Sequence, residues 1–359
     1  MLAASIPLSE IPPESWDAAR ADPRTPMRQY IWASAYQETL ARGDVRAVIV
    51  GSPARPTAIA PFAEPAGGPR RQVLMGAEDL WESIEVAAQD DRALQALAAQ
   101  IASSPVPMRF GHHPTDTRFM DMLRHECRGR ARVVVARQPV RAMPRILLDD
   151  SWRVPESHFN SRRRSDFRRM SRRAQGLGEV SFEILTPDEA GIDALLDDAF
   201  EVEANNWKGR SGTAISQDAR TEAFYRAYAR RAMNAGILRL CFMRIDGRAA
   251  AMQFAVECEN RFWLIKVGYD DAFAHASPGN LLMRETISHA AAKGLEAYEF
   301  LGKEAEWTKL WAGDARPIAT LRTYPYNARG LSAFVADAAA LVRKRVSARL
   351  GPKGGQDRA

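Results

Sequence analysis

Two carboxylates and a lysine stand close together in the stretch 298-YEFLGKEAEWTKLW-311. Glu304 and Glu306 follow a predicted strand at 296–301, and a position beyond a strand end makes both candidate general bases. The alternative is a solvated first helical turn, in which acidic side chains complement the helix dipole. Lys309 comes three residues after Glu306, so the two share a helical face. The lysine therefore either forms an ordinary ion pair or stabilises developing negative charge.

Tyr269 and Asp270 follow another predicted strand, at 261–268. The Tyr269 phenol can act as a proton donor in catalysis, and Asp270 is a candidate substrate-binding residue. The alternative for Tyr269 is a half-buried side chain that caps the strand.

An aromatic side chain and two cations occur together where two predicted helices join. This combination suits a sugar or an anionic acceptor, because the ring offers a stacking face and the cations offer charge. The alternative is a tryptophan that only closes the helix. The three residues are Trp207, Lys208 and Arg210.

A helix is predicted to begin at Ser277, with Pro278 at the first helical position. Gly279 follows, although glycine lowers helix propensity by about 1 kcal/mol relative to alanine. The backbone amides of Gly279, Asn280 and Leu281 are predicted to point out of the helix, where the dipole supplies roughly +0.5 charge. Without a side chain at Gly279, a phosphate can come close to them. The alternative is that Ser-Pro-Gly is only a good cap.

Hydrophobic periodicity predicts the elements that position these residues. From residue 179 the predicted order is strand, helix, helix, three strands, helix, strand, helix, strand. Asp246-Gly247 between two apolar runs indicates a hairpin. The helix at 277–294 is then the crossover of a parallel strand pair, so its N-terminus lies where open α/β sheets usually bind ligands. Before residue 150, helices are predicted at 30–43 and 91–104, and strands at 44–51, 57–64, 107–111 and 131–137.

Length and composition indicate a soluble protein of two domains, since the chain has 359 residues and is 46% hydrophobic. Its three cysteines are too few and too irregular for a disulfide framework or a zinc site, so no metal is expected. No stretch approaches the ~18 apolar residues of a membrane span. The N-terminus also lacks the pattern of a signal peptide. These features predict a cytoplasmic protein.

Basic residues exceed acidic ones by 50 to 44 and cluster in 161-SRRRSDFRRMSRRAQ-175, which holds seven arginines. Such a helix could bind nucleic acid, but no recognised nucleic-acid module accompanies it, so this partner is not favoured. A polyanionic acceptor or a membrane surface is a second possible partner. A solvated, salt-bridged helix face is the third interpretation.

The order of the predicted elements over 179–324 resembles the GNAT superfamily of acyl-CoA N-acyltransferases. Four stretches resemble more specifically the CelD/BcsL-type acetyltransferases associated with cellulose and exopolysaccharide synthesis. The most specific of them is 266-KVGYDDAFAHASPGNLL-282, through its Lys-x-x-Tyr-Asp and Ser-Pro-Gly-x-Leu-Leu elements. The sequence differs from the commonest GNAT pattern in its Ser-Pro-Gly-Asn turn and in Trp307, near where many relatives have a tyrosine. The four stretches are 205-NNWKGRSGTAI-215, 266-KVGYDDAFAHASPGNLL-282, 298-YEFLGKEAEWTKLW-311 and the Arg-rich helix 162–173.

The resemblance implies that acetyl-CoA or another acyl-CoA is the co-substrate, with its diphosphate on the helix N-terminus and its pantetheine arm along the strand 261–268. It favours Lys309 as a stabiliser of negative charge. It also places the acceptor beside Trp207, Lys208 and Arg210. The implied cofactor-binding residues are Val267, Gly268, Ser277, Gly279, Asn280 and Leu281.

The same group is similar to the Fem-type aminoacyl transferases, which carry two GNAT-like halves in one chain. This implies an α/β (α+β) fold of two tandem GNAT-like domains, each a mixed central sheet flanked by helices. Residues 1–150 would be a degenerate N-terminal domain, and 151–330 the complete acyltransferase domain, led by the Arg-rich helix 159–175. Residues 331–359 would form a C-terminal helix and a basic tail.

The leading hypothesis is an N-acyltransferase that moves an acetyl or other acyl group from CoA to an amine, with a polysaccharide or cell-envelope precursor as a candidate acceptor. A Fem-like aminoacyl transferase that uses charged tRNA is the second hypothesis. The third is a non-catalytic accessory protein of a polysaccharide synthase. The acceptor and the oligomeric state do not follow from the sequence, because fold alone does not fix function.

Overall fold

The first 150 residues of the chain alternate short strands with helices in the computed structural model, which describes residues 5–19, 25–65, 67–82, 86–206, 212 and 214–350. The helices predicted at 30–43 and 91–104 and the strands predicted at 44–51 and 57–64 are all confirmed. The strands are β1 (Ser5–Pro7), β2 (Arg46–Ser52), β3 (Arg55–Ala63), β4 (Gln72–Leu74), β5 (Ala87–Ala88), β6 (Met108–Pro114) and β7 (Ala131–Leu147), and the helices are α1 (Pro13–Ala18), α2 (Tyr30–Thr39), α3 (Asp91–Ala102) and α4 (Arg118–Glu126).

From residue 179 onward the elements follow the predicted order of strands and helices. The predicted hairpin is confirmed, because Asp246 (φ 47°) and Gly247 (φ 77°) both adopt the left-handed conformation that a tight turn of this kind needs. The elements are α5 (Ser161–Gln175), β8 (Val180–Leu185), α6 (Ile192–Ala204), α8 (Ala219–Asn234), β9 (Leu238–Ile245), β10 (Arg248–Cys258), β11 (Arg261–Tyr269), the 3₁₀ helix η6 (Asp271–Ala276), α9 (Pro278–Ala292), β12 (Ala297–Glu299), α10 (Glu306–Lys309), β13 (Asp314–Pro325) and α11 (Ala328–Leu350).

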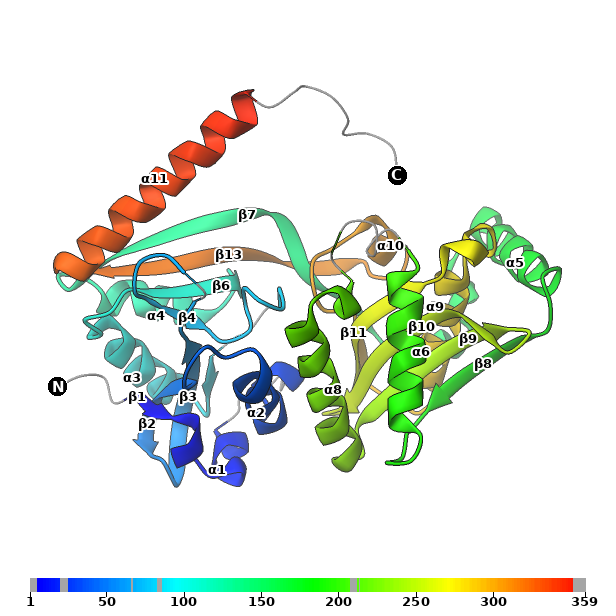
Figure 1. Ribbon diagram of the computed structural model, residues 1–359, viewed down its shortest axis with the longest axis horizontal. Coiled ribbons are helices and arrows are strands. Elements are labelled where there is room, and N and C mark those ends of the chain that lie inside the picture. Colours follow the sequence, from blue (N-terminus) through cyan, green and yellow to red (C-terminus); the bar gives the residue numbers. More distant parts are fainter. Residues whose placement is uncertain are drawn as a thin grey trace.

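A single mixed sheet of 13 strands runs through the described residues (Figure 1). Its order is β1-β2-β3-β4-β6-β13-β7-β12-β11-β10-β9-β8, with β5 paired to β3. Helices lie against the sheet along its length, which confirms the predicted α/β class of mixed sheet flanked by helices.

The last strand, β13, returns to the first half of the chain and inserts between β6 and β7. The long strand β7 in turn pairs with β12, which joins the two halves into one sheet. The predicted division at residues 150 and 330 therefore does not separate the strands into two independent sheets. Whether 1–150, 151–330 and 331–359 fold as separate units stays a prediction.

Strands β10 and β11 are covered on both faces. On one face, α6 and α8 pack over Phe254 and Trp263, and the α8 aromatics also contact Trp32 of α2, with ring centroids 4.9 and 4.8 Å apart for Phe224 and Tyr228. On the other face lies α9, whose apolar side chains pack with those of β9 to β12. Among the described helices, none is long and apolar enough to cross a membrane.

Candidate active site

Strands β11 and β12 start as parallel neighbours and then separate. Within the described residues their register covers only Arg261–Trp263 of β11 against Ala297–Glu299 of β12. The chain after β12 turns toward β7, where the amide of Phe300 donates to the carbonyl of Pro144 at 2.9 Å. Strand β11 meanwhile continues to Tyr269 beside β10. The divergence opens the sheet next to the start of α9, at the carboxyl end of the parallel pair, where ligands bind in open α/β sheets.

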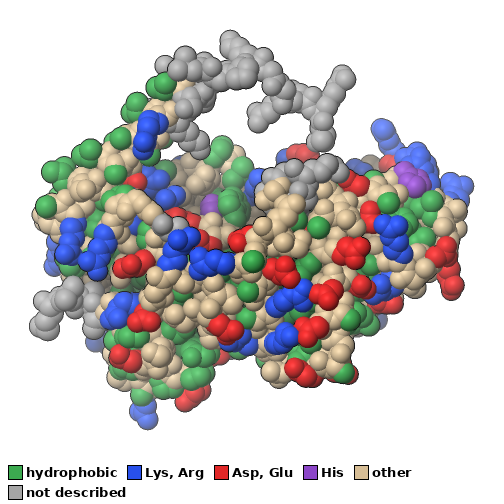
Figure 2. Space-filling view, viewed as in Figure 1, with side chains coloured by type: hydrophobic (Ala, Val, Ile, Leu, Met, Phe, Trp, Pro, Cys, Tyr) green, Lys and Arg blue, Asp and Glu red, His purple; other side chains and the backbone are tan. Residues whose placement is uncertain are grey.

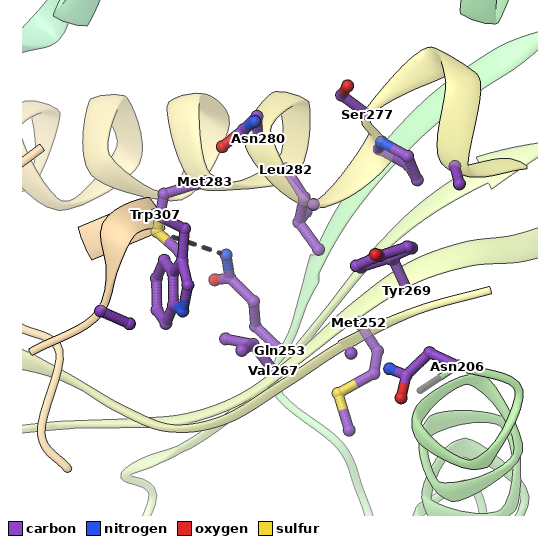
Figure 3. Close-up of a pocket in the computed structure, with 15 residues that line it drawn as sticks. Asn206, Met252, Gln253, Val267, Tyr269, Ser277, Asn280, Leu282, Met283 and Trp307 are labelled. Carbon is purple, nitrogen blue, oxygen red and sulfur yellow. Dashed lines mark hydrogen bonds between the residues drawn. The ribbon is translucent and has the colours of Figure 1, made fainter. Parts of the chain in front are cut away.

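A cavity of about 440 Å³ occupies this opening (Figure 3). Its floor comes from β10 and β11, its roof from η6 and the first turns of α9, and its side from the segment around α10. Its volume lies in the range of small-molecule and cofactor sites. The lining residues are Asn206, Met252, Gln253, Val267, Gly268, Tyr269, Ala274, Ser277, Pro278, Gly279, Asn280, Leu282, Met283, Ala305 and Trp307.

The N-terminus of α9 forms one wall of the cavity, as predicted, but fewer amides are open than predicted. Ser277 is the N-cap residue in a left-handed conformation (φ 52°, ψ 53°), and its side chain makes no capping bond to described residues. Its carbonyl instead accepts from the amides of Asn280 at 3.1 Å and Leu281 at 3.3 Å, so the prediction that these two amides are free is wrong. Leu281 is also buried beneath the helix. Among described residues, the amide of Gly279 has no acceptor and remains the open donor.

Gly268 and Gly279, the two predicted glycines of the site, lack a side chain for different structural reasons. A Cβ on Gly268 would lie 2.8 Å from the Cα of Glu203, so this glycine lets α6 approach the back of β11. A Cβ on Gly279 would meet only the ring of Tyr269, at an ordinary 3.8 Å. The fold therefore requires Gly268, whereas the absent side chain at Gly279 leaves room in the cavity itself.

Tyr269 and Asp270 are adjacent in sequence but differ in surroundings. The Tyr269 ring lies in the cavity below the start of α9 (Figure 3), and its hydroxyl bonds to no described residue. Asp270 is buried; its carboxylate accepts from the amide of Ala272 at 2.8 Å and from Arg248 at 2.5 Å. Asp270 thus starts η6 and holds the hairpin, whereas Tyr269 faces the cavity, and the roles predicted for both stay predictions.

The predicted catalytic acids and lysine lie outside the cavity lining. Glu306 and Lys309 form an ion pair of 2.7 Å, and the Glu306 side chain is 90% exposed. Glu304 is half-buried, and its amide donates to the carbonyl of Arg141 at 2.7 Å. The indole of Trp307, in contrast, forms part of the cavity wall. An exposed pair of this kind matches the alternative of a solvated helical turn, and a catalytic role for it stays a prediction.

The predicted acceptor-binding residues Trp207, Lys208 and Arg210 lie outside the described residues. The last described residue before them, Asn206, is buried and lines the cavity. Their role at an acceptor site stays a prediction.

Sequence reasoning missed Gln253, which stands within the apolar run of β10 and points into the cavity. Its Oε1 accepts from the hydroxyl of Tyr298 at 3.2 Å, and Tyr298 in turn bonds to the hydroxyl of Thr286 at 3.0 Å. The only signal in the sequence was one amide side chain between apolar neighbours in 249-AAAMQFAVE-257. A polar residue on a buried strand needs a partner, which should have marked it as a site residue.

The Arg-rich helix α5 contacts the segment just before α9. The seven arginines of α5 are exposed, while its Phe167 and Ala174 are buried. Arg173 donates to the carbonyl of His275 at 3.1 Å, two residues before the N-cap of α9. Figure 2 shows Lys and Arg side chains gathered at the edge of the molecule that carries α5. The arrangement favours an anionic group at the start of α9.

Comparisons with known proteins agree with this geometry. Residues 161–309 match the family model of the acetyltransferase (GNAT) domain. The comparison with curated proteins gave no match. Three solved structures are similar. FemX is 13% identical over 88% of this chain and 96% of its own, with a TM-score of 0.57, and a conserved protein of unknown function from Bacteroides thetaiotaomicron VPI-5482 is 13% identical over 89% of this chain and 97% of its own, with a TM-score of 0.52. The C-terminal domain of a candidate lysylphosphatidylglycerol synthetase from Agrobacterium fabrum is 12% identical over 88% of this chain and 93% of its own, with a TM-score of 0.50.

At such identities the three structures establish likeness of fold alone. With the family match, they confirm the predicted GNAT fold for the part of the chain that holds the cavity. The CelD/BcsL-type assignment and a role in polysaccharide synthesis stay predictions.

Proposed function

We propose that the protein is an N-acyltransferase that moves an acetyl or related acyl group from acyl-CoA to an amine. The observation that carries the proposal is the 440 Å³ cavity between β11 and α9, which joins a helix N-terminus to the edge where β11 leaves β12. Such a cavity offers an anion site at one end and an extended strand edge alongside, and acyl-CoA has a diphosphate followed by an extended amide-bearing arm.

The diphosphate is assigned to the start of α9. The amide of Gly279 and the hydroxyl of Ser277 supply donors there, and the helix dipole adds partial positive charge. Arg173 adds a full charge nearby. Because Asn280 and Leu281 donate to Ser277, the site has fewer backbone donors than predicted, and the arginines of α5 offset part of that loss.

The pantetheine arm is assigned to the edge of β11 at Val267 and Gly268, which brings the thioester toward Tyr269 and Gln253. The amine nitrogen forms a bond to the acyl carbon, the C–S bond breaks, and the nitrogen loses a proton to a base. We assign Tyr269 to protonate the departing thiolate, since its hydroxyl lies in the cavity without another described partner. Glu304 and Glu306 stay the predicted bases, and Lys309 the predicted stabiliser of charge.

The acceptor is an amine, and the resemblance to CelD/BcsL-type proteins supports an amine on a polysaccharide or cell-envelope precursor. Asn206 lines the cavity directly before Trp207, Lys208 and Arg210. An aromatic ring with two cations at that position would suit a sugar carrying negative charge.

Titration calorimetry with acetyl-CoA tests the proposal. Wild type should bind, and Gly279→Val should weaken binding at least 10-fold by covering the open amide. Gly313→Val is the matched control, because an added Cβ there meets nothing within 4 Å and its affinity should stay unchanged. Absence of heat together with absence of a thermal shift for wild type would reject acyl-CoA as the donor.

A Fem-like transfer from aminoacyl-tRNA is the second candidate, and the exposed arginines of α5 favour it. Phosphate contacts make affinity fall steeply with salt. Filter binding of charged tRNA over a salt series distinguishes the two, because a steep slope with tight binding at low salt supports tRNA.

An accessory role without turnover would be supported if Tyr269→Phe kept full cellular function.

A further inference from the structure

The side chain of Gln253 is held in the cavity with its amide nitrogen poorly satisfied. The residue is 2% exposed and lies on β10, across from Val267 of β11. Its Nε2 donates to the thioether sulfur of Met283 at 3.7 Å, which is the bond drawn in Figure 3. A thioether is a weak acceptor, so a buried amide donor faces the cavity without a strong partner.

The other end of the Gln253 amide is fixed by a buried chain of hydroxyls. Tyr298 donates to Oε1 at 3.2 Å, and its own hydroxyl oxygen lies 3.0 Å from that of Thr286. Thr286 bonds to the carbonyls of Leu282 and Met283 at 3.2 Å each, within α9. Burial raises the pKa of the Tyr298 phenol well above its ordinary value, so the group is protonated at neutral pH and can donate.

This network also fixes which end of the amide faces the cavity. With Oε1 toward Tyr298, both ends of the amide have a partner of the right kind. The flipped amide would place Oε1 against the sulfur of Met283, which has no hydrogen to donate. The unflipped orientation is therefore preferred, and it aims the N–H group at the cavity.

We propose that Nε2 of Gln253 donates a hydrogen bond to the carbonyl oxygen of the donor's acyl group and stabilises the negative charge that develops on it. The inference rests on the proposed function. As the amine nitrogen bonds to the acyl carbon, the carbonyl π electrons move to oxygen, which the amide N–H then stabilises. When the oxygen re-forms its double bond, the C–S bond breaks and the thiolate leaves. Gln253 neither gains nor loses a proton.

Tyr298 and Thr286 act in this reaction as positioning residues. They do not line the cavity, and they keep the Gln253 amide from rotating. Donors that are already oriented toward the developing oxyanion need no reorganisation during the reaction, which is why they contribute strongly to rate. Met283 serves as a temporary acceptor that the acyl oxygen replaces.

The test compares wild type with Gln253→Leu, which keeps the size of the side chain and removes the donor. Loss of one oxyanion donor typically costs about 10²–10³ in kcat, and we expect a loss in this range. The affinity for CoA without an acyl group should stay within about 3-fold, since the assigned diphosphate contacts are unchanged. Tyr298→Phe should lower kcat by about 10-fold through loss of orientation, with the same CoA affinity.

A spectroscopic signature separates this role from a structural one. The carbonyl stretch of carbonyl-labelled acetyl-CoA should shift to lower wavenumber on binding to wild type, and Gln253→Leu should abolish the shift. If Gln253→Leu binds acetyl-CoA with the wild-type shift and the wild-type kcat, the inference is overturned while the proposed function stands. If wild type does not bind acetyl-CoA at all, the proposed function fails, and this inference fails with it.

Discussion

The two faces of β10 and β11 are built from the same strands but serve opposite purposes. On the face toward α6 and α8, aromatic side chains fill the space, and Tyr225 and Tyr228 lie close to Phe254, with centroids 5.9 and 6.3 Å apart. On the face toward α9, the cavity remains. We call these the closed face and the open face.

The difference arises from how each helix meets the strands. Helix α6 comes within direct contact of the backbone at Gly268, which leaves no space between them. Helix α9 is tied to β10 near its far end through Glu257, and its first turns border the cavity. The closed face therefore contributes mainly to folding, and the open face keeps polar groups available for a ligand. Paired substitutions on the two faces test this contrast.

The largest effect is expected from Gly268→Ala on the closed face. The new Cβ would lie 2.8 Å from the Cα of Glu203, and backbone atoms cannot move aside as a flexible side chain can. Overpacking of this kind costs about 3 kcal/mol or less, which denaturant unfolding will measure.

Gly279→Ala is the matched change on the open face. Its Cβ would lie 3.8 Å from the Tyr269 ring, so unfolding stability should stay equal or rise by up to about 1 kcal/mol. Equal destabilisation by the two substitutions would contradict the contrast between the faces.

The far end of α9 should detach in acid. Glu257 of β10 binds His289 at 2.9 Å and Lys293 at 2.8 Å, both at the end of α9, and Arg239 of β9 at 2.7 Å. Burial alone would raise the pKa of this carboxyl, but the hydrogen bonds from His289, Lys293 and Arg239 lower it to about 2, from an ordinary value of 4.5.

Because the folded-state pKa lies below the unfolded one, this carboxylate stabilises the fold fully above about pH 4.5, and the contribution disappears as pH falls toward 2. The loss should be on the order of 2 kcal/mol. Glu257→Gln should flatten the dependence of unfolding stability on pH in that window. An unchanged slope would show that the carboxylate does not hold α9.

A buried tyrosine on each face gives a second comparison. On the closed face, the hydroxyl of Tyr228 is buried without a hydrogen bond to described residues, so Tyr228→Phe should leave stability equal or raise it by about 1 kcal/mol. On the open face, Tyr298→Phe removes the donor to Gln253 and should lower stability by about 1–2 kcal/mol. Thermal unfolding of both variants measures the difference, and a reversal of the two signs would contradict the assignment of the faces.

The sequence predicted the elements well where a local pattern determines them. The order from β8 to β13 followed from periodicity, and Asp246-Gly247 marked its turn. Partners far along the chain were not predictable in this way. Glu257 meets His289 across 32 positions, and Gln253 meets Tyr298 across 45. Ser277 adopts its left-handed conformation between the end of η6 and the start of α9. Its carbonyl there accepts from the amides of Asn280 and Leu281, which the sequence predicted to be free. The insertion of β13 between β6 and β7 depends on pairing across about half the chain.

The smallest effect is expected from the exposed pair Glu306 and Lys309. Hydrogen bonding to Glu306 raises the pKa of Lys309, but both side chains are solvated, and exposed pairs contribute little. Glu306→Gln should change the melting temperature by less than about 2 °C and should leave acetyl-CoA binding unchanged. The informative measurement is kcat, because Glu306 is also a predicted base. An unchanged kcat would leave Glu304 as the predicted base, while a 100-fold loss at constant melting temperature would support Glu306 as the base.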